Sequence, residues 1–356
     1  MTDMTSLQLD APLALITGAN GWLGGRVVEA LTTGLPDASA INSDGIKIRA
    51  LVPAGENVAA LRAAGVEIVS GDIRDGQARD ALMQGAQGAV RIHLAGIIHP
   101  RRVADFEAIN TQGAIELVAA ARRAGVKRAV VMSSNSPIGC NPHPDHRFDE
   151  DSPYHPYMGY GRSKWLMELA LRKEIAAGGP TQIVILRAPW FYGPNQPPRQ
   201  TQFFRLIKDG KFPMIGSGVN RRSMGYTDNL AQGVLLAAAH PAAAGQIFWI
   251  ADETPYTMNE IIATVRAVLR EDFGFAVKDK APRAPGFVSD IATLVDATLQ
   301  GVGVYQQQIH VLSEMNKTIA CDIAKAKRVL GYAPHVALRE GMRRSVDWCL
   351  KNGQTI

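Results

Sequence analysis

Short apolar runs alternate with longer Ala-rich stretches through the first half of this 356-residue chain, and this alternation restricts the possible folds more than any other feature. The predicted strands are residues 13–17, 46–52, 67–70, 89–94, 128–133 and 183–187. The helices predicted between them are residues 22–33, 56–64, 77–83, 105–124 and 157–177. Nearly all residues of the strands are apolar, which is typical of strands covered on both faces. We therefore predict an α/β fold with a doubly wound parallel sheet.

A glycine-rich turn joins the first predicted strand to the first predicted helix. Residues 17–25 read TGANGWLGG, with Gly18, Gly21 and Gly24 spaced three residues apart. Such glycines permit a tight turn, a close approach of backbone N–H groups to a pyrophosphate, and close packing of the helix on the sheet. The helix N-terminus attracts the same anion. A turn without a ligand is the alternative, but the strand–turn–helix context favours a dinucleotide site and hence a Rossmann-type sheet.

The pattern changes after residue 187, where proline and glycine cluster and helices no longer alternate with strands. We predict a dinucleotide-binding domain over residues 1–188, to which residues 225–251 return. Residues 189–224 and 252–356 are predicted to form a smaller substrate-binding region. That region includes an apolar helix ending near residue 299 and a closing helix over residues 338–350.

Tyr160 and Lys164 are four residues apart in a predicted helix, so they share one face. A phenol has a pKa of about 10, and proton transfer near neutrality requires lowering it by roughly three units, or about 4 kcal/mol. A neighbouring ammonium and a positively charged nicotinamide both act in that direction. Tyr160 would then exchange a proton with the substrate oxygen while hydride is transferred, and Lys164 would hold the nicotinamide ribose. An ordinary helix-surface pair is the alternative.

Other polar residues support this interpretation. Ser133 and Ser134 end the fifth predicted strand, at the edge where parallel sheets bind ligands. Asn110 lies inside a predicted helix, where asparagine is mildly unfavourable, and it is a candidate for ordering a water beside Lys164. Asp72, just after the third strand, is a candidate to accept a hydrogen bond from adenine, with a helix cap as its alternative role.

The chain resembles the extended short-chain dehydrogenase/reductase family, which includes the NAD-dependent epimerase/dehydratase and 3β-hydroxysteroid dehydrogenase groups. The resemblance runs in order through TGANGWLGG, GDIRD, HLAG, VMSSNSPIG, YGRSK, RAPWFYGP, YTDN and LGYAP. It implies Ser134, Tyr160, Lys164 and Asn110 as catalytic residues. It also implies a cofactor site made of Gly18, Asn20, Gly21, Trp22, Leu23, Gly24, Asp72, Ile73, Leu94, Ala95, Gly96, Ser133, Tyr160, Lys164, Pro189 and Phe191.

The cofactor is NAD or NADP, and the sequence leaves the choice open. An acidic residue about 20 positions after the turn would select NAD. Asp44 lies at that distance but in an apparent insertion, so we do not assign it this role. The second strand ends in Leu51-Val52-Pro53, with neither an acid nor an arginine.

The substrate is the least determined feature. Asn135, Trp190 and Arg222, together with Ser134, are the predicted substrate contacts. In the nucleotide-sugar members of the family an arginine after a Gly-x-Gly turn holds the diphosphate, and Arg222 matches it. Trp190-Phe191-Tyr192 instead suggests an aromatic wall, and Asn135-Ser136 replaces the acidic pair of the sugar dehydratases. We predict an oxidoreductase for a secondary alcohol and its ketone, with a nucleotide-sugar epimerase as the alternative.

Other classes of partner are not expected. The net charge of +5 is dispersed, and no basic run suits a nucleic acid. No segment approaches the roughly 18 apolar residues of a membrane span, and the first ten residues do not resemble a signal peptide. Three separated cysteines are consistent with the cytoplasm. His143 and His146 lack a third ligand, so we predict no metal. The resemblance further implies a homodimer joined through the helices of residues 105–124 and 157–177.

Overall fold

The computed structural model describes residues 7–35, 41–43 and 45–356. A seven-stranded parallel sheet lies at its centre, in the order β13-β8-β7-β6-β2-β4-β5. The chain runs from β2 outward to β5 and then returns to β6 on the other side of β2, so the crevice at the carboxyl ends of β2 and β6 is the position where such sheets bind ligands. The strands of the sheet are β2 (Leu13–Thr17), β4 (Lys47–Val52), β5 (Glu67–Ser70), β6 (Val90–His93), β7 (Arg128–Met132), β8 (Gln182–Arg187) and β13 (Ile247–Trp249). The predicted fold class is confirmed.

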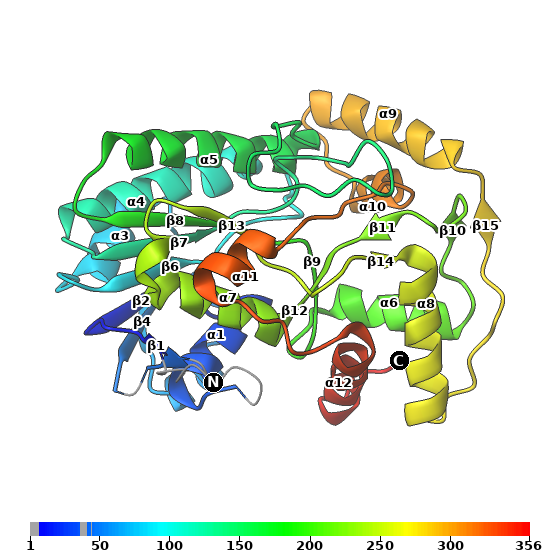
Figure 1. The fold of residues 1–356 in the computed structure, drawn as a ribbon, viewed down its shortest axis with the longest axis horizontal. Coiled ribbons are helices and arrows are strands. Elements are labelled where there is room, and N and C mark those ends of the chain that lie inside the picture. The colour runs from blue at the N-terminus through cyan, green and yellow to red at the C-terminus, as the bar shows by residue number, and fades with distance from the viewer. Residues whose placement is uncertain (1–6, 36–40, 44) are drawn as a thin grey trace.

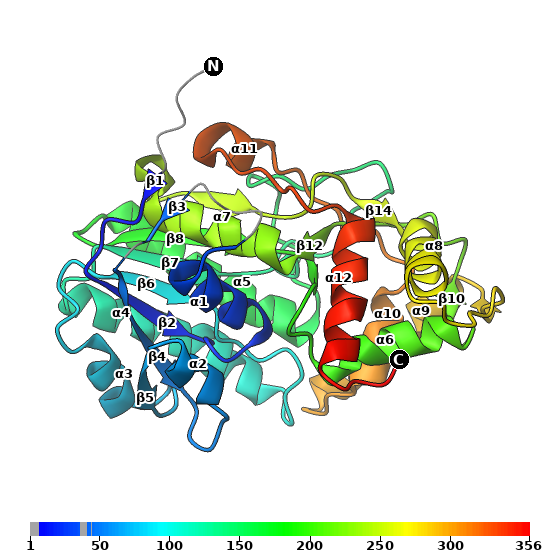
Figure 2. The same ribbon diagram turned by 90° about the horizontal axis from the view of Figure 1, so that it is seen from below.

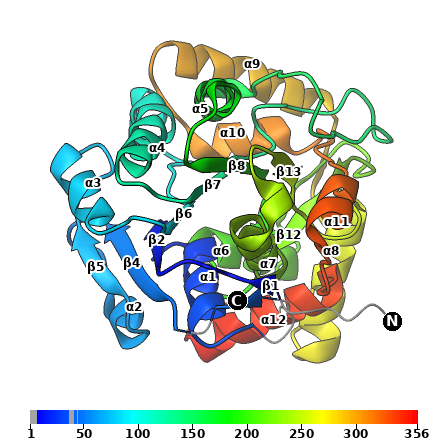
Figure 3. The same cartoon turned by 60° about the vertical axis from the view of Figure 1, so that its left-hand side comes forward.

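Helices cover both faces of the sheet (Figures 1 and 3). One face carries α1 (Trp22–Thr32), α2 (Ala59–Ala63), α7 (Thr227–Ala239), the short helix η2 (Pro241–Ala243) and α11 (Ala324–Leu330). The other carries α3 (Gly76–Met83), η1 (Phe106–Gly113), α4 (Ala114–Arg123) and α5 (Met158–Ala177). Successive residues of a strand point to opposite faces, so Ala14 and Ile16 join the first core whereas Leu13 and Leu15 join the second. This explains why the strands read as unbroken apolar runs.

The remaining elements form a second body beside the carboxyl edge of the sheet, with its own apolar core (Figure 2). Its helices are α6 (Pro198–Lys208), α8 (Met258–Ala267), η3 (Val268–Asp272), α9 (Phe287–Gly301), α10 (Gln307–Glu314) and α12 (Leu338–Lys351). Its strand pairs are β9 (Trp190–Tyr192) with β12 (Met224–Tyr226), β10 (Met214–Ile215) with β15 (Arg283–Ala284), and β11 (Arg221–Arg222) with β14 (Tyr256–Thr257). A further pair, β1 (Leu7–Gln8) with β3 (Ile41–Asn42), lies near the N-terminus. The division into a cofactor part and a substrate part stays a prediction.

Helix α7 is bound to the helix that follows the glycine-rich turn. The guanidinium of Arg26 in α1 donates to both carboxylate oxygens of Asp228 in α7, at 2.7 and 2.8 Å, and both side chains are buried. The two residues are 202 positions apart. A late segment of the chain is therefore tied to an early one.

Two predicted helices differ from those observed. The single helix expected over residues 105–124 is a π-helical segment, η1, followed by α4. The helix expected over residues 56–64 is limited to α2, because Asn57 accepts a hydrogen bond from the backbone of Ala59 and begins the helix late. Among the described residues, no helix combines the length and the apolar character needed to cross a bilayer.

Candidate active site

The glycine-rich turn has the shape of a phosphate cradle. Gly18 adopts φ +80°, and a Cβ there would lie 2.6 Å from the backbone nitrogen of Ala95. A Cβ on Gly24 would overlap the backbone oxygen of Gly18. Helix α1 begins directly after Gly21, and no side chain caps its N-terminus. Its first backbone N–H groups are therefore available to bind a ligand. Side chains are excluded where the backbone must approach a pyrophosphate, and the residues present fit a dinucleotide.

Neighbouring residues of the turn contact two other segments. The side-chain amide of Asn20 lies 3.4 Å from a carboxylate oxygen of Glu56, in the loop after β4. The indole of Trp22 donates to the backbone oxygen of Pro194 at 2.8 Å, and its ring meets Phe191 edge-on at 6.2 Å. The turn is thus joined to the segment after β9, as expected if both contact one cofactor.

The segment after β6 lies between the cradle and the predicted catalytic residues. Leu94 and Ala95 contact Gly18, and a Cβ on Gly96 would lie 3.2 Å from the side-chain oxygen of Asn110 and 3.4 Å from Nζ of Lys164. The Asn110 amide exchanges two hydrogen bonds with the backbone of the residue after Gly96, at 2.8 and 2.9 Å. Gly96 is therefore flanked by Asn110 and Lys164, and the π-helical turn η1 points Asn110 at this loop.

The structure joins Tyr160 to Ser134 by a hydrogen bond, and Lys164 lies one turn further along α5 with its Nζ beside Gly96. Burial raises the pKa of Tyr160 to about 12, against a hydrogen bond with Ser134 that lowers it. Lys164 is 4% exposed, its Nζ donates to the backbone oxygen of Met132 at 3.0 Å, and burial lowers its pKa to about 8. The lowering of the phenol pKa that the sequence analysis requires depends on an ammonium together with a bound nicotinamide, so it stays a prediction.

Helix α9 holds the backbone that leads into Tyr160. Met158 has φ +52°, a left-handed conformation that is unfavourable for residues other than glycine. Next to it, the backbone nitrogen of Gly159 donates to Oε1 of Gln300 at 2.9 Å, and the hydroxyl of Tyr157 bonds that of Ser313 at 2.7 Å. These contacts from α9 and α10 stabilise a strained turn one residue before the predicted proton donor.

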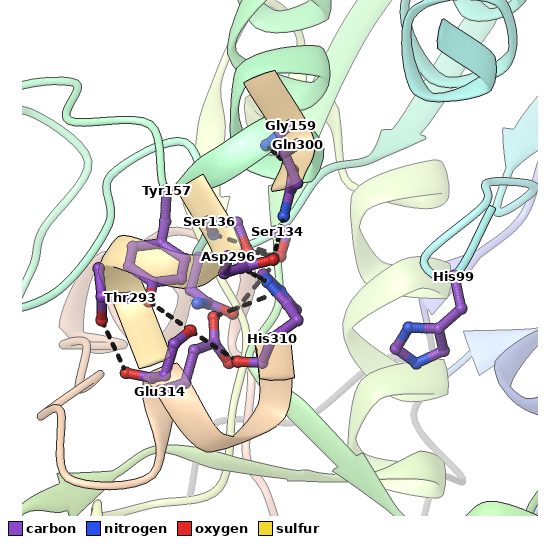
Figure 4. Close-up of polar contacts among 12 residues, drawn as sticks. His99, Ser134, Ser136, Tyr157, Gly159, Thr293, Asp296, Gln300, His310 and Glu314 are labelled. Atoms are coloured by element: carbon purple, nitrogen blue, oxygen red, sulfur yellow. Dashed lines mark hydrogen bonds and ion pairs between the residues drawn. The ribbon is translucent and has the colours of Figure 1, made fainter. Parts of the chain in front are cut away.

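The same two helices contain a buried polar chain (Figure 4). Gln300 donates to Asp296 at 2.9 Å, and the other carboxylate oxygen of Asp296 contacts Nδ1 of His310 at 2.7 Å. Burial lowers the pKa of His310, but the hydrogen bond to Asp296 and the charges of Glu314 and Asp296 outweigh this, so the pKa is raised. A protonated His310 would be held between two carboxylates.

The predicted substrate contacts lie in different parts of the structure. Ser134 lies 3.4 Å from both the side-chain oxygen of Asn135 and the hydroxyl of Ser136. Trp190 packs edge-on against Phe203 at 5.4 Å, in the core of the second body. The three aromatic residues from 190 to 192 do not form one wall, because Tyr192 is fully buried and donates to Asp252 at 2.7 Å.

Arg222 lies opposite a carboxylate. Its guanidinium is 3.9 Å from Glu314, while its Nε is buried and has no hydrogen-bond partner among the described residues. The charge of Glu314 also raises the pKa values of Tyr157 and Tyr160. A negative charge therefore faces the region where a diphosphate was considered.

Other predicted cofactor residues lie along the same edge. Asp72 is engaged by Arg74, which contacts both carboxylate oxygens at 2.9 and 2.6 Å, and the cap of α3 is Asp75 rather than Asp72. Ile73, Leu23 and Pro189 are buried side chains. Asp44 lies outside the described residues.

Ser133 faces inward, to a buried ion pair behind the site. Its hydroxyl donates to Glu168 at 2.5 Å, and Glu168 binds Arg187 at 2.7 Å with both side chains fully buried. Tyr154 donates to the same carboxylate at 2.8 Å. Ser133 therefore supports the strand ends, and Ser134 is the residue that faces the phenol.

The histidine-rich loop has structural contacts. His146 bonds Asn141 at 2.9 Å and its ring meets Phe148 at 5.2 Å. Within the described ranges, no three His, Cys, Asp or Glu side chains are grouped as metal ligands.

Sequence reasoning missed Glu56, Gln300, Asp296, His310 and Glu314. One signal was available in the helix that was treated as apolar. Its polar residues 289, 293, 296 and 300 recur at helical spacing and define one face.

Comparisons with known proteins agree with this geometry. The sequence model of the NAD dependent epimerase/dehydratase family matches residues 14–251. An uncharacterized protein, y4nL, of Sinorhizobium fredii is 67% identical over 355 residues, 100% of both chains. A 4-hydroxy-2-methyl-3-oxo-4-farnesyl-3,4-dihydroquinoline-1-oxide ketoreductase of Stigmatella aurantiaca is 25% identical over 92% of this chain and 93% of its own.

A solved structure shares the fold. The UDP-glucose 4-epimerase of Thermotoga maritima, determined with UDP-glucose, superposes with a TM-score of 0.74 at 20% identity, covering 96% of this chain and 100% of its own. The family match covers most of the chain, including the cradle and the segment that carries Ser134, Tyr160 and Lys164. The protein belongs to the NAD-dependent epimerase/dehydratase family of extended short-chain dehydrogenases/reductases.

Proposed function

We propose that this protein is an NAD-dependent oxidoreductase that interconverts a secondary alcohol and its ketone. The observation that carries the proposal is the hydrogen bond between Tyr160 and Ser134 at the carboxyl edge of the sheet, with Nζ of Lys164 beside Gly96, in the loop that contacts the phosphate cradle. Bound NAD would supply the hydride acceptor and a positive charge beside the phenol. The family membership supports chemistry that depends on NAD.

The contacts of the four predicted catalytic residues suggest a role for each in this reaction. The hydroxyls of Ser134 and Tyr160 would hold the substrate oxygen, and Tyr160 would accept or donate its proton. The phenol is protonated at neutral pH, and the positive charge of bound NAD would lower its raised pKa toward the range in which it exchanges protons. Lys164 would bind the nicotinamide ribose, and Asn110 would hold the loop at Gly96 that separates it from Lys164.

We further propose that NAD is preferred over NADP. The carboxylate of Glu56 beside Asn20 would repel a 2′-phosphate and accept hydrogen bonds from a ribose diol. Fluorescence titration with NADH and NADPH tests this, and Glu56→Gln should reduce the preference for NADH by about tenfold, the effect of roughly 1.4 kcal/mol. Glu107→Gln, an exposed change on η1, is the control.

The substrate is proposed to be a neutral or apolar carbonyl compound. Glu314 faces Arg222, so an added diphosphate would meet a carboxylate there. A nucleotide-sugar epimerase remains the second candidate because the buried Nε of Arg222 has no hydrogen-bond partner in the described part of the chain, and a diphosphate oxygen would supply one.

Two measurements separate the candidates. An epimerase purifies with bound NAD and gives no net consumption of added cofactor, whereas an oxidoreductase consumes NADH stoichiometrically with a ketone. Tyr160→Phe should lower kcat by about 100- to 10,000-fold, the usual contribution of a general acid. Tyr256→Phe, a half-buried tyrosine of β14, is the matched control. Unchanged turnover in Tyr160→Phe would exclude the mechanism.

We also propose a homodimer joined through the helical segment of η1 and α4 and through α5, as the resemblance implies, and a cytoplasmic location. A monomer in sedimentation velocity experiments would exclude the dimer.

A further inference from the structure

Helix α9 has its apolar side in solvent and its polar side in the protein. Phe287, Ile291 and Leu294 are 59%, 56% and 70% exposed, whereas Ser289 and Asp296 are fully buried. A surface helix of a globular protein normally has the reverse arrangement. We define the apolar face of α9 as Phe287, Ile291, Leu294 and Val295, all exposed.

Hydrogen bonds fix this orientation. On the inward side, Ser289 donates to the backbone oxygen of Ser313 at 2.6 Å. Further along the helix, Asp296 contacts His310 and Gln300 accepts from the backbone of Gly159, as described above. Rotation of α9 to bury its apolar face would break all three contacts and leave buried polar groups unpaired. These hydrogen bonds therefore keep the apolar face of α9 exposed to solvent.

The apolar surface continues beyond the helix. Val302 and Val304, directly after α9, are exposed. Ile98 is exposed on the loop after β6, and its neighbour His99 bonds the hydroxyl of Tyr305 at 2.7 Å. The loop after β6 is thus joined to the segment that follows α9, and α9 itself lies at the outer rim of the molecule (Figures 1 and 3). A surface of this extent generally indicates an apolar partner.

Basic residues occur at both ends of this surface. Lys280 and Arg283 precede α9 and are exposed, and exposed Arg101 follows Ile98, whereas its neighbour Arg102 is paired with Asp105 at 2.9 Å. The exposed acid of α9, Asp290, is paired with Lys317 at 2.6 Å. An anionic surface complements this distribution, whereas a second copy would bring the same positive ends together.

We propose that α9 binds the protein to an anionic lipid surface, with the apolar face of α9 at the boundary between headgroups and acyl chains. The helix would lie in the plane of the surface, as amphipathic interfacial helices do. This inference goes beyond the proposed function and differs from the expectation that the chain has no membrane partner. Because the opposite side of α9 holds Gly159, the lipid-bound face and the Tyr160 site would share one helix.

Vesicle flotation tests the proposal with the full chain. Vesicles of phosphatidylcholine with phosphatidylglycerol should carry the protein upward, and vesicles of phosphatidylcholine alone should carry less. The double variant Ile291→Ser/Leu294→Ser should lose binding by about tenfold or more, because two apolar side chains leave the interface. Val219→Ser/Leu350→Ser removes two exposed apolar side chains elsewhere and should bind as the native protein does.

Thermal unfolding and NADH oxidation with a water-soluble ketone should be the same for all three proteins, which separates lipid binding from catalysis. The proposal is overturned if the native protein does not float with anionic vesicles, or if the α9 variant floats equally well. It is also overturned if sedimentation shows a dimer that the α9 variant alone dissolves, since a second copy would then cover this face.

Discussion

Lys164→Met should make the cofactor-free protein more stable at neutral pH while it removes activity. Lys164 is charged at pH 7, yet burial lowers its pKa from 10.5 to about 8. This shift of about 2.5 units corresponds to about 3 kcal/mol of unfavourable free energy in the folded state. The substitution also leaves the backbone oxygen of Met132 without its donor, at a cost of about 1 kcal/mol. We expect a net gain of about 2 kcal/mol at pH 7.

The sign of the pH dependence makes this prediction specific. Between the folded pKa of about 8 and the unfolded value of 10.5, the unfolded chain binds more protons at Lys164 than the folded one. The stability contributed at this site therefore rises with pH in the native protein and not in the variant. The advantage of Lys164→Met should shrink above pH 8 and vanish near pH 10.

Urea unfolding at pH 7 and pH 10 measures the difference. Lys173→Met, an exposed lysine on the same helix, is the control and should change neither value by more than about 0.5 kcal/mol. A variant less stable than the native protein at pH 7, or an advantage that persists at pH 10, would show that Lys164 does not carry an unfavourable buried charge.

Three further outcomes follow from the geometry. Gly24→Ala should abolish NADH binding in fluorescence titrations, because its methyl group overlaps the backbone of the cradle, whereas Gly301→Ala has open space and should bind normally. Glu168→Gln should lower the free energy of unfolding by about 3 kcal/mol in urea, because it leaves the charge of Arg187 buried, and an effect below 1 kcal/mol would contradict this. Gln300→Ala should lower kcat more than it raises KM, because the turn before Tyr160 loses its support, and a variant with the native kcat would show that Gly159 needs no support from α9.

The strands of the central sheet were predictable because both of their faces are buried. β2 and β5 match their predicted ranges, and the other four predicted strands agree within one residue at each end. A strand covered on both faces requires apolar residues at every position, and the sequence records this locally. The cradle was predictable for a similar reason, since Gly18 and Gly24 are required by contacts within one turn and its neighbouring loop.

The parts that were missed depend on distant partners. The π-helical turn at Asn110 reflects two hydrogen bonds to the backbone of Ile97, and no residue within the helix indicates them. Likewise, the partners of Gln300 and Asp296 come from α5 and α10, so nothing within this helix, rich in apolar residues, indicates their contacts.

The link between Arg26 and Asp228 bears on how the chain is made. Helix α7 and strand β13 complete one face and one edge of the sheet, yet they are synthesised after the whole of β9 and α6. Until α7 and β13 have left the ribosome, the part of this face that α7 covers is bare, although α1 and α2 cover the rest, and Arg26 has no carboxylate from Asp228. A nascent chain ending at residue 188 should therefore bind holdase chaperones and resist compaction, and release should coincide with the emergence of β13.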